Sequence, residues 1–193
     1  MQKSSKTLAI EKLQDVLTEL GLDLTDESLV ETPGRIYRAW AEFCEHRNTQ
    51  LVEVLGKQFT STSDTPLDEF VMVRDIQFSA LCAHHFFPFY GHAAIAYLPN
   101  KRLVGLSKLS RLVTVASHQA PTLQEYLTRD IGMAISKALQ PQGVFVVMEA
   151  VHTCASCRGA RSSSASTITS YVSGIFRTSS GAKMEVLSMW RGK

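Results

Sequence analysis

The chain has 193 residues, of which 45% are hydrophobic, and its formal net charge at pH 7 is +2. This length and composition suit one domain with a proper core, or one domain with a helical appendage. So small a net charge argues against nucleic acid or an anionic membrane as the main partner, and no run approaches the roughly 18 apolar residues of a membrane span. We therefore expect a cytoplasmic protein.

The first part of the chain is predicted to be helical. Its apolar residues recur with a helical period as far as Gly21, which stands where a C-terminal cap is expected. A second helix is predicted from Thr32, the N-cap, which is followed by a proline. Residues 59–68 are polar and turn-rich, so they are predicted to be a linker. The expected division is an N-terminal helical segment, residues 1–58, and a domain of residues 59–193.

After the linker, the apolar period changes to that of strands. Ser107 is a candidate N-cap of one helix, and Pro121 is expected to open the next. Two strand pairs with two consecutive helices between them predict an α+β domain. The expected strands lie at about residues 70–78, 89–98, 144–151 and 162–173, the two helices at 107–115 and 121–139, and a last helix at 182–190.

Two short windows, residues 82–85 and 152–157, concentrate the residue types that bind metals. Together they hold three of the six histidines and three of the four cysteines. The fourth cysteine, Cys44, lies alone in a helical pattern, which favours metal binding in a reducing compartment over disulfides. Thiolate and imidazole are the ligands that zinc prefers. The sequence therefore predicts a zinc site that folding assembles from both windows.

Spacing alone permits two kinds of zinc site. If Cys82, His85, Cys154 and Cys157 all bind, they form a closed structural site with no position left for chemistry. If only Cys82, His85 and Cys154 bind, the fourth position can hold a water whose pKa the metal lowers. The two remaining imidazoles, His84 and His152, favour the open site, because titratable rings beside an activated water suit general acid/base work.

Four motifs follow one another along the chain: Cys82-x-His84-His85, the segment from Gly105 to Arg111, Gln124-Glu125, and His152-Thr153-Cys154 followed by Arg158-Gly159. They occur in the same order as in GTP cyclohydrolase I, and the chain resembles that family over about residues 30–190. The resemblance implies the tunnelling fold (T-fold), with an antiparallel sheet and two consecutive helices. It also implies a ring-shaped homo-oligomer, a decamer of two pentamers, with sites at subunit interfaces.

The resemblance also implies a reaction. GTP would be hydrolysed at zinc, with opening of the guanine imidazole ring, release of formate and reclosure to 7,8-dihydroneopterin triphosphate, a step of pterin and folate-type biosynthesis. By matching positions, the expected roles are triphosphate binding for Lys108, Arg111 and Arg158, contact with the ribose-phosphate end for Ser107, base binding for Gln124 and Glu125, zinc binding for Cys82, His85 and Cys154, and proton transfer for His84 and His152.

Some of these residues have plainer explanations from the sequence alone. Lys108 and Arg111 lie three apart at the start of a helix, which is also typical of a solvated face. A carboxylate such as Glu125 in the first turn of a helix is favoured by the helix dipole. It could equally accept two parallel donors from guanine, which makes Glu125 the candidate for base selectivity.

Three departures from the family pattern cluster around the expected site. Ala83 replaces the usual glutamate, residues 119–122 form a segment that is one residue longer, and Cys157 is an extra cysteine. Loss of the glutamate removes an ion pair or a partner that orients an imidazole. Three alternatives therefore stay open: a relative that stops at a ring-opened intermediate or uses another purine nucleotide, a catalytically silent nucleotide-binding protein, and a structural zinc module.

Overall fold

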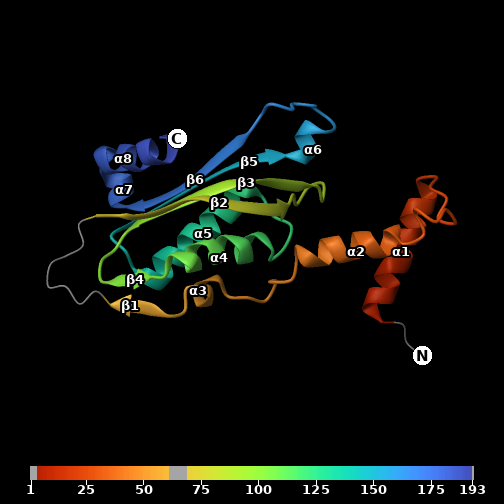
Figure 1. The fold of residues 1–193 in the computed structure, drawn as a ribbon, viewed down its shortest axis with the longest axis horizontal. Coiled ribbons are helices and arrows are strands. Elements are labelled where there is room, and N and C mark those ends of the chain that lie inside the picture. Colours follow the sequence, from red (N-terminus) through yellow and green to blue (C-terminus); the bar gives the residue numbers. More distant parts are fainter. Residues whose placement is uncertain (1–3, 61–68, 193) are drawn as a thin grey trace. The chain divides into compact units, whose positions relative to one another are not determined.

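The computed structural model describes residues 4–60 and 69–192, and the chain divides into two compact units, residues 1–45 and 46–193 (Figure 1). Most of the expected linker lies outside the described residues. Its first two residues, Phe59 and Thr60, belong instead to a short strand, β1 (Gln58–Thr60), which pairs with residues 102–104. The proposed division between residues 58 and 59 stays a prediction.

The first unit holds two helices, as expected. Helix α1 (Ser5–Glu19) begins after Ser4, whose hydroxyl accepts a hydrogen bond from the Thr7 N–H, and Gly21 follows it with φ +85°. Helix α2 (Thr32–Glu42) has Glu31 at its N-cap, with no side-chain cap bond, so the prediction of Thr32 as the cap is wrong by one residue. The proline after Thr32 explains the start of the helix, because it lacks only an N–H that a first turn leaves unpaired.

The second unit contains a four-stranded antiparallel sheet in the order β2-β3-β5-β6. Its two consecutive helices, α4 and α5, follow β4 and precede β5, as expected. The elements are α3 (Leu51–Val54), β2 (Val71–Leu81), β3 (Pro88–Leu98), β4 (Arg102–Val104), α4 (Leu106–Ser117), α5 (Gln124–Leu139), β5 (Gly143–His152), α6 (Thr153–Ser156), β6 (Thr167–Gly174), α7 (Ile175–Thr178) and α8 (Ser180–Arg191).

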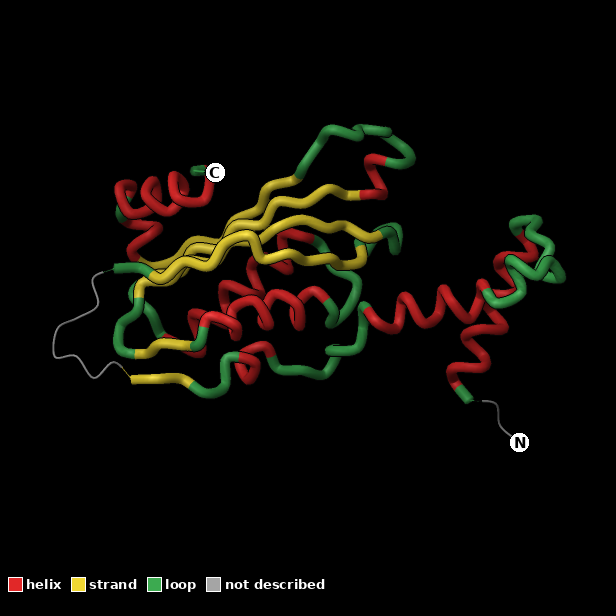
Figure 2. Tube along the Cα trace, viewed as in Figure 1, coloured by secondary structure: helices red, strands yellow, loops and turns green. Residues whose placement is uncertain are grey.

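Both faces of the sheet are covered. Helices α4 and α5 pack on one face, where alternate residues of β2, β3 and β5 form the main core, and α7 and α8 lie on the other (Figure 2). The smaller cluster under α7 and α8 includes Phe145, Phe176 and Val186. Strand β5 is apolar on both sides for this reason. The structure confirms the α+β architecture with a preceding helical segment.

Two expected helix starts are wrong by a few residues. Helix α4 has Gly105 at its N-cap and no side-chain cap bond, so Ser107 lies in the first turn and does not cap the helix. Helix α5 begins at Gln124, three residues after Pro121. The residues after Pro121 are instead tied to another segment: Thr122 pairs with Cys82 in an isolated parallel bridge.

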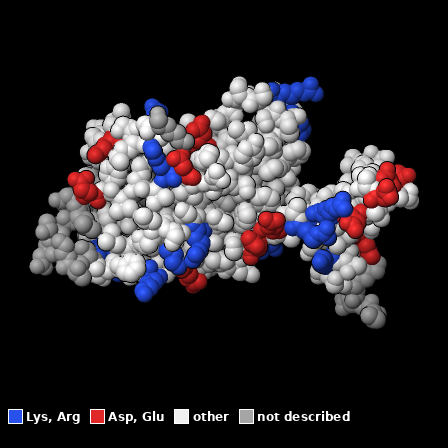
Figure 3. Space-filling model, viewed as in Figure 1, with Lys and Arg blue, Asp and Glu red and all other residues white. Residues whose placement is uncertain are grey.

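Charged side chains of both signs are interspersed over the face of the second unit that is in view (Figure 3). Among the described residues, the helices are too short or too polar to cross a bilayer.

Gly132 sets the distance between α5 and β6, and its replacement by alanine is expected to lower the free energy of unfolding by about 1 to 3 kcal/mol. A Cβ at this buried position would lie 2.1 Å from Cδ1 and 2.4 Å from Cγ of Tyr171, so the ring or the helix must move. Unfolding in denaturant at matched protein concentration measures the change.

Gly181→Ala is the matched control, because a Cβ there would meet nothing closer than the Ser179 Oγ at 3.8 Å. This exposed glycine lies in the first turn of α8, so its replacement is expected to leave stability unchanged or raise it by up to about 1 kcal/mol. Equal effects of the two substitutions would contradict the packing argument.

Candidate metal centre and its surroundings

The sheet brings the two windows of metal-binding residue types to the same end. Strands β2 and β5 are both antiparallel to β3, which lies between them. They therefore run in the same direction and finish at the same end of the sheet. Cys82 directly follows β2, and His152 is the last residue of β5. In the register of the sheet, His152 pairs with Phe89 at the start of β3. The topology thus explains why Cys82 and His152, about 70 positions apart in the sequence, lie at the same end of the sheet.

The turn between β2 and β3 presents His85 next to Cys82. The Cys82 N–H donates to the Phe87 carbonyl at 2.9 Å, and the Phe86 N–H donates back to the Cys82 carbonyl at 2.9 Å. Phe86 has φ +56°, a left-handed conformation that costs a non-glycine residue about 1 to 2 kcal/mol. This tight turn reverses the chain and places His85 next to Cys82.

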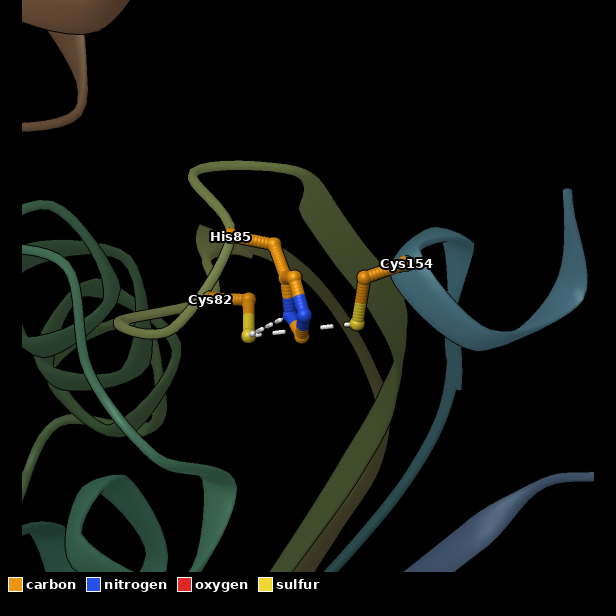
Figure 4. A group of neighbouring side chains, drawn as sticks. All are labelled: Cys82, His85 and Cys154. Carbon is orange, nitrogen blue, oxygen red and sulfur yellow. Dashed lines mark hydrogen bonds between the residues drawn. The ribbon is translucent and has the colours of Figure 1, made fainter. Parts of the chain in front are cut away.

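Cys82, His85 and Cys154 form the one group of potential metal ligands found among the described residues (Figure 4). Their ligand atoms all lie within 4.8 Å of one another. The Sγ atom of Cys82 is 3.9 Å from Sγ of Cys154 and 4.0 Å from Nδ1 of His85. Two residues come from the β2–β3 turn and the third from α6, so the fold joins both windows. The arrangement is compatible with a bound metal ion.

The electrostatics of the two thiols also favour a cation. Burial, followed by the hydrogen bond and the charge of Cys82, raises the pKa of the Cys154 thiol, while Arg158 opposes the shift. Two adjacent thiolates repel each other, and a cation bound between them offsets this repulsion because it attracts both.

His152 lies two residues before Cys154, at the end of β5, and its ring makes contacts on two sides. Its ring stacks on Phe89, with ring centroids 4.6 Å apart and planes 2° apart. Its Nε2 atom lies 2.8 Å from Oε1 of Gln124. Burial lowers the pKa of His152, and the negative charge of Glu125 opposes this shift. The other candidate proton carrier, His84, is exposed, and its ring meets the His85 ring edge-on at 6.1 Å.

Gln124 is almost completely buried, with 1% of its surface exposed. Its Nε2 donates to the carbonyls of Met148 and Thr167, both at 3.0 Å, and to Oγ1 of Thr169 at 3.1 Å. The side chain therefore connects the first turn of α5 to β5, β6 and His152. The residue types at 167 and 169 give no sign of this in the sequence, and neither does Phe89, which looks like an ordinary strand residue.

The structure does not bring all the predicted site residues together. Glu125 is exposed at the start of α5, and its negative charge opposes the lowering of the His152 pKa by burial. Arg158 is exposed after α6, and its positive charge opposes the raising of the Cys154 pKa by burial. By contrast, α4 begins beside β4, at the opposite end of the sheet from α6 (Figure 1). The 11 residues of β3 separate these ends by about 33 Å. Ser107, Lys108 and Arg111 lie in the first half of α4, away from the metal-ligand group of the same chain.

Two of the three departures from the family pattern contact each other. The Ala83 N–H donates to the Thr122 carbonyl at 3.1 Å, and the Thr122 N–H donates to the Leu81 carbonyl at 2.8 Å. The segment of residues 119–122 is thus hydrogen-bonded to the ligand-bearing turn through its backbone. The third departure, Cys157, is exposed, and its Sγ donates to the Thr153 carbonyl at 2.7 Å.

The sequence is similar to known proteins of one family. The chain matches the family model described as GTP cyclohydrolase I over residues 9–191. A protein named GTP cyclohydrolase 1 from Sulfurihydrogenibium is 42% identical over 90% of this chain and 88% of its own length. The proteins of the same name from Saccharomyces cerevisiae and Streptococcus suis are 42% and 41% identical, over 86% and 98% of this chain and 67% and 100% of their own lengths.

Among solved structures, an archaeosine synthase QueF-Like in the apo form superposes with a TM-score of 0.45 at 14% identity, over 57% of this chain and 97% of that chain. The family model spans nearly the whole sequence, and the relatives named above match over at least two thirds of their own lengths. The chain belongs to the GTP cyclohydrolase I family.

Proposed function

We propose that this protein is a zinc-dependent hydrolase that opens the guanine imidazole ring of GTP, releases formate and recloses the product to 7,8-dihydroneopterin triphosphate. One observation supports this beyond family membership: three soft ligands form a group at one end of the sheet, and the imidazole of His152, which is not among them, lies two residues before the ligand Cys154. A purely structural metal site has no need of that second imidazole.

The ligand group fits zinc. Two thiolates at Zn–S distances of about 2.3 Å in tetrahedral geometry have their sulfurs about 3.8 Å apart, and the Sγ atoms of Cys82 and Cys154 are 3.9 Å apart. Cys157, hydrogen-bonded to Thr153, does not join the group. Bound there, zinc would act as a Lewis acid that activates water near neutral pH.

The protein's own side chains supply the remaining chemistry in this proposal. His152 and His84 move protons at the purine and ribose. Glu125, exposed at the start of α5, accepts the two N–H donors of guanine, a pattern that adenine lacks. Arg158 contributes a bidentate donor to the triphosphate.

Incubation of zinc-loaded protein with GTP tests the proposal, with formate and the ultraviolet spectrum of the product followed together. Formate and a pterin chromophore in stoichiometric amounts are expected. Inosine triphosphate, which lacks the 2-amino group, is the matched comparison and should turn over more slowly if Glu125 recognises the base. A ring-opened product without formate would favour the early-stopping relative, and binding without any reaction would favour the silent nucleotide-binding protein.

We further infer that the active site is completed by a neighbouring copy of the chain, in a homo-oligomer that the family resemblance describes as a decamer of two pentamers. The start of α4, with Lys108 and Arg111, lies at the far end of the sheet from the metal-ligand group. Within the described residues, the outer edges of β2 and β6 pair with no further strand, which suits edge-to-edge assembly. Cytoplasmic location stays a prediction.

Complementation between two inactive variants tests this assembly. Lys108→Ala combined with Arg111→Ala in one chain, and His152→Ala in another, are each expected to be inactive alone. Co-expressed chains should recover about a quarter of the wild-type activity, because random assembly gives one site in four an intact metal half and an intact phosphate half. Absence of recovery in oligomers shown to contain both variants would mean that each site is built within one chain.

A further inference from the structure

We propose that Gln124 is a positioning residue that fixes the tautomer and orientation of His152, and that it does not itself bind the guanine base. This inference rests on the proposed function for its kinetic meaning. The inference is drawn from the hydrogen bond between Nε2 of His152 and Oε1 of Gln124, at 2.8 Å, and from the contacts that determine the orientation of the Gln124 amide.

The orientation of the Gln124 amide follows from its neighbours. Two of the three atoms around its Nε2, the carbonyl oxygens of Met148 and Thr167, can only accept hydrogen bonds. A flipped amide would place its oxygen against both carbonyls and its NH₂ group against the histidine ring. The NH₂ group must therefore face the strands, and the oxygen must face His152.

The hydroxyls around the amide agree with this orientation. Thr128 Oγ1 lies 2.7 Å from the backbone carbonyl of Gln124, to which its single proton is donated. The 2.6 Å contact between the hydroxyls of Thr128 and Thr169 then takes its proton from Thr169. Thr169 Oγ1 is left as an acceptor for the Gln124 amide at 3.1 Å. Every hydroxyl donor in this buried network has an acceptor of its own, and the two protons of the Gln124 amide are shared among three acceptors.

His152 must therefore carry a proton on Nε2, because the Gln124 oxygen offers only lone pairs. In the neutral ring the other nitrogen, Nδ1, then holds the lone pair and is the atom able to accept a proton from substrate. The stack on Phe89 fixes the plane of the ring, and the Gln124 hydrogen bond fixes its rotation within that plane. This is the way in which a third group commonly orients a catalytic base.

Burial separates this role from base recognition. Gln124 has 1% of its surface exposed, whereas its neighbour Glu125 is exposed at the same helix end. Glu125 and Gln124, which belong to one sequence motif, thus have different roles. Glu125 can contact a ligand, and Gln124 orients His152.

Gln124→Met, which keeps the length of the side chain and removes its hydrogen bonds, tests the proposal. It is expected to lower kcat about 10- to 100-fold with KM for GTP within about threefold, as is usual for a partner that orients an active-site histidine. In a His152→Ala background the same substitution should have no further effect on kcat. Gln142→Met is the matched control, because its amide bonds the Pro99 carbonyl at the far end of β3.

A rise in KM at unchanged kcat, or an additional loss in the His152→Ala background, would overturn the positioning role. The nitrogen-15 spectrum of histidine-labelled wild-type protein, with His152 assigned by its disappearance in His152→Ala, gives a second readout that needs no stable Gln124 variant. A protonated Nε2 and an unprotonated Nδ1 are expected, and the reverse assignment overturns the proposal. Wild-type protein that releases no formate would overturn the proposed function, while the spectrum would still decide the tautomer.

Discussion

Replacement of His152 by alanine is expected to leave the metal content of the protein unchanged and to lower kcat for GTP by about 10²- to 10⁴-fold. Its Nε2 faces Gln124 and its ring stacks on Phe89, and among the described residues it is not a member of the metal-ligand group. The substitution therefore removes a proton carrier and leaves the ligand set intact. Metal analysis of the purified variant and steady-state formate release measure the two effects separately.

His92→Ala is the control for loss of an imidazole, because His92 is exposed in the middle of β3, away from the site. It should retain activity within about twofold. Added imidazole is expected to restore part of the His152→Ala activity if the lost function is proton transfer. A fall in bound metal in His152→Ala would show that His152 is a ligand, and the proposed separation of ligand and proton carrier would fail.

Much of the fold and the composition of the metal-ligand group could be predicted from the sequence. The period of apolar residues locates β2, β3 and β5, because each strand must bury alternate side chains or both of its faces. Few residue types bind metals, so the clustering of cysteine and histidine in two windows marks the group before the fold is known. Cys82, His85 and Cys154 are indeed brought together.

The support around His152 could not be predicted in the same way. Gln124 is 28 residues from His152 and 43 from Thr167, and it reaches both only because β5 and β6 pair with Met148 opposite Thr169. A glutamine in the first turn of a helix carries no information about which carbonyls it will face. Strand register sets these contacts, and register depends on the whole sheet.

The departures at Ala83 and residues 119–122 are also clearer in the structure. Both belong to one backbone contact, in which the Ala83 N–H donates to the Thr122 carbonyl. This bond does not depend on the side chain at position 83, which is exposed. A longer segment before Gln124 is therefore compatible with the backbone bond that joins it to the ligand-bearing turn.

Replacement of Cys154 by serine is expected to remove about one equivalent of zinc per chain and to reduce formate release more than about 10³-fold. The Cys154 Sγ lies 3.9 Å from that of Cys82, and it is the ligand that α6 contributes to the group. A serine hydroxyl stays protonated near neutral pH and is a poor zinc ligand, so only two soft ligands would remain. Zinc content of the purified variant, measured before and after dialysis against a chelator, gives the result independently of activity.

Cys157→Ser is the matched control and decides between the open and the closed site. Because the Cys157 Sγ donates to the Thr153 carbonyl and a serine hydroxyl can make the same bond, this variant should keep its zinc and its activity within about twofold. Loss of zinc from Cys157→Ser would mean that four protein ligands surround the metal. No position would then remain for an activated water, and the protein would have to be reclassified as a structural zinc module on a cyclohydrolase fold.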